Sequence, residues 1–313
     1  MMKNYTSNAV LWLFAIAMPI MMNAQMSYVD SLKVDDKVRF FKYTKPKENS
    51  GKAKIVFVLH GSGMSMDFME EVVGGQFNTL ALQDSNTIIV YPEGHKGNWN
   101  DCRAKATYPA KLENSNDVTF LLDIKKRLKR KFDFDDLDVY AVGYSNGGHM
   151  CFKLAKVASS EFKGFAVVGA NLPVSDNDDC TSSHKAVSML LINGTTDPIN
   201  PYGGGEVWSG DGQTRGCVMS LEATRDYWLS LLPGESKLES KIDYEDTYPR
   251  DNSRAVQRTY SSFGSSIKIS TLEIMNGGHH FANPDFKDWP DYLGNLNRDV
   301  NLPEIIMTFF ESI

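Results

Sequence analysis

The chain has 313 residues, of which 42% are hydrophobic and 23% are charged, which suits one large globular domain or two small ones with an ample core. The formal net charge is −6, and the one dense basic cluster, residues 125–131, ends an amphipathic helical pattern. Because binding to nucleic acid requires clustered Lys and Arg that neutralise phosphates, this composition argues against a nucleic-acid partner.

The first 24 residues differ in character from the rest. Lys3 is the only charged residue before Asp30, residues 9–20 are almost wholly apolar, and a small residue follows at position 24. This is the layout of a secretory signal peptide. The run is shorter than the roughly 20 apolar residues of a spanning helix and contains Pro19, so an uncleaved membrane anchor is the less favoured alternative.

We expect a signal peptide at 1–24 and a single folded domain at 25–313. The mature protein should be secreted or periplasmic, with no attachment to a membrane after cleavage. The sequence leaves its oligomeric state open.

Short β-branched runs alternate with longer segments of helical periodicity along the remaining chain. This alternation predicts an α/β fold with a mainly parallel sheet covered by helices on both faces, in which sites form beyond the carboxyl ends of the strands. The predicted strands are 54–59, 87–91, 137–142, 165–168, 187–192 and 267–275, and the predicted helices are 117–130, 146–158, 221–231 and 303–310.

Ser145 lies in a Gly-x-Ser-x-Gly turn between a predicted strand and a predicted helix. The pattern is typical of a nucleophile elbow, in which small neighbours, here Gly143 and Gly147, let a strained turn lift the serine above the sheet. By itself the pattern also fits a glycine-rich turn with a bystander serine. In an elbow, the backbone N–H of Asn146 would donate to an oxyanion. The N–H of Ser62, in the turn after strand 54–59, is the favoured second donor, and that of Gly63 is the alternative.

A serine nucleophile needs a base, and the base needs an acid that orients it. Asp197 lies just past the strand at 187–192, and His279 follows two glycines after the strand at 267–275. The order Ser145, Asp197, His279 is that of the α/β-hydrolase fold, so these three residues are the predicted catalytic triad. His60 and His149 lie within the two glycine-rich motifs, and we expect them to be structural.

Several blocks of the sequence resemble one known family, the secreted polyhydroxybutyrate depolymerase and feruloyl esterase group of α/β-hydrolases. The blocks are LHGSGMS (59–65), YPEGHKGNWNDCR (91–103), NDVTFL (116–121), VYAVGYSNGGHM (139–150), INGTTDPINPYGGG (192–205), GGHHF (277–281) and NRDVNLPEIIMTFF (297–310). The resemblance implies an α/β-hydrolase fold, with the nucleophile at Ser145, the acid at Asp197 and the base at His279. The sequence departs from the family's usual residues at His280, where a small polar residue is common, and at the two residues after it.

The four cysteines are Cys102, Cys151, Cys180 and Cys217. An exported protein can hold disulfides, and four cysteines permit three full pairings. Cys151 falls on the helix after Ser145 and is a predicted buried thiol. No cysteine shows CxxC spacing, so we expect no zinc site, and the predicted chemistry needs no metal or cofactor. The resemblance implies a disulfide between Cys102 and Cys217, whose loops border the same face in the family.

The predicted activity is hydrolysis of carboxylic esters through an acyl-enzyme, with an ester substrate as the partner. Tyr144, Trp99, Tyr202 and Trp208 are predicted to border the site and to contact substrate, although each could simply pack. Soluble feruloyl or acetyl esters of plant polysaccharide fragments are the preferred substrates, and oligomers of poly(3-hydroxybutyrate) are the alternative. A serine peptidase and a non-catalytic binding protein on the same fold are more remote alternatives.

Overall fold

The computed structural model describes residues 27–48, 51–84, 86–209 and 212–313, so the predicted signal peptide lies outside the described residues. Ten strands form one sheet in the order β1-β2-β4-β3-β5-β6-β7-β12-β11-β10. These strands are β1 Ser27–Val34, β2 Lys37–Thr44, β3 Lys52–Leu59, β4 Thr87–Pro92, β5 Asp136–Tyr144, β6 Gly164–Val168, β7 Ser188–Gly194, β10 Ser236–Asp243, β11 Arg254–Ser262 and β12 Ile269–Met275.

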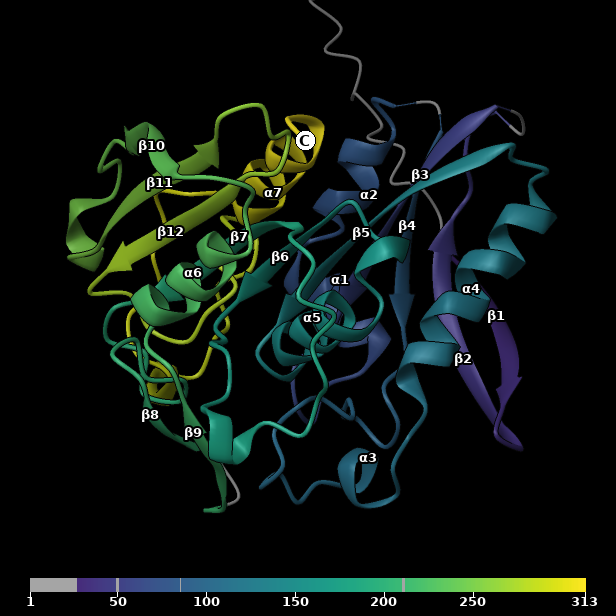
Figure 1. Cartoon of the computed structure of the whole chain (residues 1–313), viewed down its shortest axis with the longest axis horizontal. Helices are drawn as coiled ribbons and strands as arrows, with labels where there is room; N and C mark the ends of the chain where they lie inside the picture. Colours follow the sequence, from purple (N-terminus) through teal and green to yellow (C-terminus); the bar gives the residue numbers. More distant parts are fainter. Residues whose placement is uncertain (1–26, 49–50, 85, 210–211) are drawn as a thin grey trace, which may run out of the picture.

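Seven α-helices in the described ranges accompany the sheet (Figure 1). They are α1 Met66–Val72, α2 Gln76–Ala81, α3 Pro109–Leu112, α4 Asp117–Lys131, α5 Asn146–Val157, α6 Leu221–Ser230 and α7 Leu302–Glu311. A separate two-stranded sheet, β8 (Gly205–Trp208) with β9 (Thr214–Val218), lies at the lower left of Figure 1, near the bottom edge of the molecule. None of these helices is long and apolar enough to cross a membrane.

The six central strands, β4, β3, β5, β6, β7 and β12, are parallel to one another. They coincide with the six strands predicted from the sequence, and α4, α5, α6 and α7 coincide with the four predicted helices to within a few residues. The predicted parallel sheet with helices on both faces is therefore confirmed.

Alternating side chains of the central strands divide between two hydrophobic cores. On β3, Ile55 and Phe57 belong to the core that includes residues of α4, α5 and α6, whereas Val56 and Val58 belong to the core that includes residues of α1, α2 and α7. Each such side chain contributes roughly 1.5–3 kcal/mol when it is removed from water. Burial on both faces explains why these strands are continuous apolar runs in the sequence.

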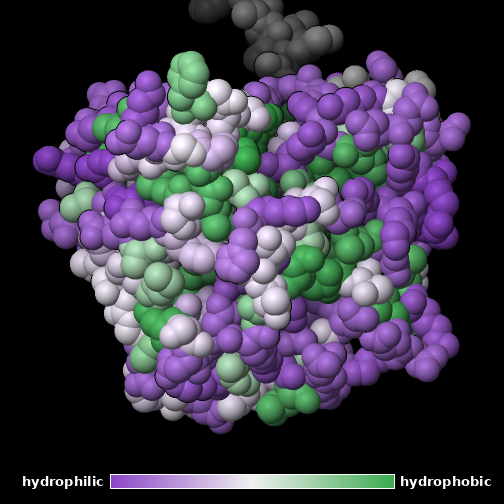
Figure 2. Space-filling view, in the orientation of Figure 1, coloured by the Kyte–Doolittle hydropathy of each residue, from purple (hydrophilic) through white to green (hydrophobic). Residues whose placement is uncertain are grey.

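Two antiparallel hairpins, which were not among the predicted elements, extend the parallel sheet, β1-β2 at one edge and β11-β10 at the other. The outermost strand β10 is exposed along almost its whole length and carries lysine and acidic residues, which protect an edge strand from pairing with another chain. The face seen in Figure 2 is mainly polar, with apolar side chains gathered in separate patches.

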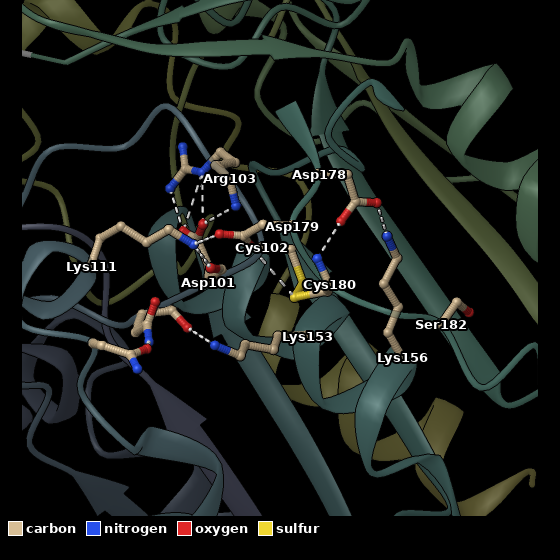
Figure 3. Close-up of a disulfide and its surroundings, with 12 residues drawn as sticks. Asp101, Cys102, Arg103, Lys111, Lys153, Lys156, Asp178, Asp179, Cys180 and Ser182 are labelled. Atoms are coloured by element: carbon tan, nitrogen blue, oxygen red, sulfur yellow. Dashed lines mark hydrogen bonds and ion pairs between the residues drawn. A yellow bond between two sulfur atoms is a disulfide. The ribbon is translucent and has the colours of Figure 1, made fainter. Parts of the chain in front are cut away.

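The disulfide joins Cys102 to Cys180, so the predicted pairing of Cys102 with Cys217 is wrong. The segments around residues 102 and 180 lie side by side, because the N–H of Asp179 donates to the carbonyl of Cys102 at 3.0 Å. This contact brings the Cα atoms of the two cysteines to 5.2 Å (Figure 3). Cys217 on β9 is a free, partly exposed thiol, and Cys151 is a buried free thiol, as predicted.

Removing this disulfide should destabilise the protein strongly. The bridge spans 78 residues, for which the chain-entropy model gives about 4.5 kcal/mol, and measured losses are typically about 2–5 kcal/mol. We expect Cys102→Ser to lower the free energy of unfolding by this order in urea titrations. Cys217→Ser is the matched control and should change it little; a larger effect of the control would contradict the observed pairing.

Candidate active site

Ser145 occupies a strained turn between β5 and α5. Its backbone has φ of 52° and ψ of −114°, a conformation that costs a non-glycine residue of order 1–3 kcal/mol. Ser145 is partly exposed, whereas its immediate neighbours are buried. The turn thus presents one hydroxyl at the carboxyl end of the central strand of the sheet.

The glycines on either side are required by close backbone contacts. A Cβ atom at Gly143 would lie 2.1 Å from the carbonyl oxygen of Gly147, and one at Gly147 would lie 2.4 Å from that of Leu59. Both obstacles are backbone atoms, which cannot rotate away as a side chain can. The Gly-x-Ser-x-Gly spacing is therefore a steric condition for this turn.

His279 and Asp197 form a buried pair. His279 Nδ1 lies 2.6 Å from Asp197 Oδ2, and neither side chain is more than 4% exposed. The other carboxylate oxygen, Oδ1, accepts the backbone N–H groups of Ile199 and Asn200, both at 2.8 Å, which fixes the orientation of the carboxylate. A hydrogen on Nδ1 directed at Asp197 leaves Nε2 of His279 free to accept a proton.

The loop that carries His279 is held by a distant segment and by the elbow itself. The N–H of His279 donates to the carbonyl of Leu293 at 2.7 Å, and the hydroxyl of Tyr144 donates to the carbonyl of His279 at 2.8 Å. The rings of Tyr144 and His279 also pack with centroids 5.2 Å apart. The residue before Ser145 thus positions the predicted base.

Ser145, His279 and Asn146 line one cavity of about 270 Å³, together with Ser62 and Tyr144. The two segments expected to supply oxyanion donors therefore open into the same space as the predicted nucleophile and base. Asp197 lies behind His279, in contact with its ring nitrogen.

Three of the four aromatic residues predicted to contact substrate do not line this cavity. Trp99 is wholly buried, and its indole N–H donates to the carbonyl of His60 at 2.9 Å, so its role is structural. Tyr202 donates to Glu273 at 2.7 Å, away from the cavity. Trp208 is half exposed, whereas its neighbours Val207 and Ser209 line the cavity. Successive side chains along a strand point to opposite faces, so the side chain of Trp208 points away from the cavity.

The cavity is walled instead by residues that the sequence analysis did not select. Some of these residues are aromatic, and the others are two arginines that lie over the ring of a tyrosine. The first group is Phe68, Trp289 and Tyr292, and the second is Arg103, Arg215 and Tyr108. They come from segments far apart in the chain, and no spacing in the sequence relates them to Ser145.

His60, beside the predicted oxyanion donor Ser62, is a structural histidine. Its Nε2 accepts the N–H of Gly94 at 2.8 Å, so the hydrogen is on Nδ1, which donates to the carbonyl of Gly61 at 2.7 Å. Burial lowers the pKa of His60 from 6.5 to about 4. The ring is therefore neutral in the folded protein at neutral pH.

Substituting Gly143 should abolish the elbow. We expect Gly143→Ala to lose nearly all ester hydrolysis and to unfold at lower temperature, because the added methyl group would overlap the carbonyl of Gly147. Gly203→Ala is the matched control, since no atom lies within 4 Å of its added Cβ. Wild-type activity of Gly143→Ala would refute the steric argument.

His60 should make the protein less stable in mild acid. Between pH 6.5 and pH 4 the unfolded chain binds a proton at this histidine that the folded protein does not, so the free energy of unfolding falls as the pH falls. The contribution over that window is about 3 kcal/mol. Urea titrations at pH 7 and pH 4.5 should show a smaller loss for His60→Gln than for the wild type; equal losses would contradict this assignment.

Comparison with known proteins gives relatives that include several named esterases. No family model matches the chain. The putative esterase NocK of Nocardia uniformis subsp. tsuyamanensis is 23% identical over 263 residues, which cover 82% of this chain and 73% of that protein. Feruloyl esterase C of Emericella nidulans is 26% identical over 156 residues, 48% of this chain and 51% of that protein, so the match spans about half of its length.

The solved structure of an acetyl xylan esterase from Aspergillus awamori has a TM-score of 0.56 at 12% identity, and covers 91% of this chain and 100% of that chain. Such a likeness shows the fold, and it confirms the predicted α/β-hydrolase architecture. The resemblance to polyhydroxybutyrate depolymerases stays a prediction. By distant homology, the chain is similar to carboxylic ester hydrolases, feruloyl esterase C among them, and it has an α/β-hydrolase fold.

Proposed function

We propose that the chain is an exported serine esterase that hydrolyses feruloyl or acetyl esters of plant polysaccharide fragments, with Ser145 as nucleophile, His279 as base and Asp197 as orienting acid. The observation that carries the proposal is that the strained Ser145 turn and the buried His279–Asp197 pair open into one cavity. This is the arrangement that acyl transfer requires.

The reaction begins when His279 Nε2 accepts the proton of Ser145 as the serine oxygen attacks the ester carbonyl carbon. Asp197 keeps the hydrogen of His279 on Nδ1 and stabilises the imidazolium that forms. The backbone N–H groups of Asn146 and Ser62 bind the oxyanion, each contributing on the order of 3 kcal/mol to transition-state stabilisation. His279 then gives its proton to the leaving alcohol, which leaves the acyl group bonded to Ser145. In the second half, His279 takes a proton from water as the water attacks the acyl carbon, and then returns a proton to the Ser145 oxygen as the acid leaves.

The cavity walls support an aromatic acyl group. Phe68, Trp289 and Tyr292 provide aromatic surfaces for an aryl ring, and the ring of Tyr144 packs against both Trp289 and the predicted base His279. The guanidinium groups of Arg103 and Arg215 can donate to phenolic or sugar oxygens. The similarity to feruloyl esterase C points to the same substrate class.

Export of the protein is part of the same proposal. The predicted signal peptide at 1–24 would direct the chain to the secretory pathway, and the disulfide between Cys102 and Cys180 would persist in an oxidising compartment. The remainder, 25–313, would then be the catalytic domain.

A fluorophosphonate probe and a substrate panel test this function. We expect the wild type to be labelled at Ser145, and Ser145→Ala to lose the label and to lower kcat by a factor of about 10⁴ or more. Asp197→Asn should lower kcat by a factor of about 10⁴, because His279 would lose its orienting acceptor. Ser145 of this variant should still be labelled, at the same rate or more slowly.

The panel consists of feruloyl-arabinose esters, acetylated xylan, 3-hydroxybutyrate oligomers and a peptide anilide. The highest kcat/KM is expected for the feruloyl or acetyl esters. Preference for the hydroxybutyrate oligomers or the peptide would overturn the substrate class, and a folded wild type that neither binds the probe nor hydrolyses any ester would overturn the enzyme assignment.

A further inference from the structure

A buried polar network lies directly beside the elbow, and the triad mechanism does not use it. Its centre is the carboxylate of Asp101, which is wholly buried. Oδ2 of Asp101 accepts Nη2–H of Arg103 at 2.6 Å, the hydroxyl of Tyr108 at 2.5 Å and Nδ2–H of Asn146 at 2.8 Å. Loss of any one of these three donors would leave part of the buried carboxylate without a hydrogen bond, which is costly in free energy.

The network holds the side chain of Asn146 at every polar atom. Nδ2 donates to Asp101 and, at 3.1 Å, to the carbonyl of Trp99, while Oδ1 accepts the N–H of Trp99 at 2.7 Å. Asn146 is the first residue of α5 and directly follows Ser145. Fixing its side chain therefore fixes the direction of its backbone N–H, the donor assigned to the oxyanion.

The same loop, residues 97–101, also holds the segment that carries the second donor. The indole N–H of Trp99 donates to the carbonyl of His60, and the hydroxyl of Ser62 donates to Oδ1 of Asn98 at 2.5 Å. The N–H of Gly63 donates to the carbonyl of Gly97 at 2.8 Å. One loop thus contacts both halves of the proposed oxyanion hole.

The loop is anchored from outside by the disulfide and by two lysines. Cys102, next to Asp101, is bonded to Cys180, and Lys111 donates to the carbonyl of Asp101 at 2.8 Å (Figure 3). Lys153 of α5 donates to the carbonyl of Asn100 at 2.7 Å. These contacts restrict movement of the loop relative to the elbow.

The negative charge of Asp101 is neutralised by the adjacent guanidinium of Arg103. Burial alone would raise the pKa of Asp101, but the adjacent Arg103 guanidinium outweighs it and holds the pKa well below its usual range. An unbalanced carboxylate beside the elbow would repel the developing oxyanion. With Arg103 in contact, the pair can orient Asn146 without a net negative charge near the reacting carbonyl.

We propose that Asp101 is a positioning residue for ester hydrolysis: through the side chain of Asn146 it aims the backbone N–H that stabilises the oxyanion. The inference rests on the proposed serine esterase function. It assigns a role to the block at residues 97–103, which carries none of the predicted triad.

The test compares Asp101→Asn with Asp138→Asn. Asp138 lies on the same strand as the elbow, at its opposite end, and is paired with Lys52 at 2.7 Å, so it is the matched control. For Asp101→Asn, kcat on p-nitrophenyl acetate should fall on the order of tenfold to a hundredfold with little change in KM. Affinity for a trifluoromethyl ketone, which forms an oxyanion with the serine, should weaken by a similar factor, and Asp138→Asn should change neither.

A double-mutant cycle shows whether Asp101 acts through Asn146. Asn146→Ala keeps the backbone N–H but removes the tethers, so it should lower kcat similarly, and the double variant should be little worse than either single one. Additive losses, or wild-type kcat and ketone affinity in either single variant, would overturn the inference. If Asp101→Asn does not fold, unchanged ketone affinity in Asn146→Ala would still overturn the inference, because the proposed route from Asp101 to the oxyanion runs through the Asn146 side chain.

The failure of this inference differs from the failure of the proposed function. A wild type that is labelled at Ser145 and hydrolyses esters, with Asp101→Asn equally active, refutes only the positioning role. A folded wild type without label or hydrolysis refutes both.

Discussion

The site depends on one steric constraint, the crowding of backbone at the turn between β5 and α5. Carbonyl oxygens occupy the space where a Cβ atom at Gly143 or Gly147 would lie. Ser145 has a positive φ, and this strained conformation directs its hydroxyl away from the sheet. Such strain persists only where the surroundings over-determine it. Here the parallel strands on both sides of β5 and the first turn of α5 supply that support.

Around the turn, each group with a catalytic assignment is held by a buried contact from another part of the chain. His279 is fixed by Asp197 and by the carbonyl of Leu293, and Asn146 by Asp101 and Trp99. A buried polar group that loses its hydrogen-bond partner cannot replace it with water, so turning away from these partners would cost free energy. The partners therefore hold each group in one orientation. Preorganised donors of this kind need no reorganisation when charge develops on the substrate.

In the proposed mechanism, the groups that carry out the chemistry and the groups that contact the substrate come from different parts of the fold. The proposed reactive groups lie at strand ends, whereas the walls come from segments outside the central sheet: helix α1 with Phe68, the segment that includes Trp289 and Tyr292, the one that includes Arg103, and β9 with Arg215. Loops tolerate change better than the sheet that they surround. Under the proposed function, changes in these walls are therefore expected to alter which ester is accepted without disturbing the elbow.

The sequence by itself determined the six parallel strands, because burial on both faces leaves continuous apolar runs. It also located Ser145, Asp197 and His279 beyond strand ends, because each follows a predicted strand within a few residues. It did not reveal the hairpins β1-β2 and β11-β10, whose partly exposed strands lack such runs. Only the tertiary structure decided the pairing of Cys102 with Cys180, the burial of Trp99 and the cavity walls. Those features join segments distant in the chain, and their contacts depend on packing in space rather than on local spacing.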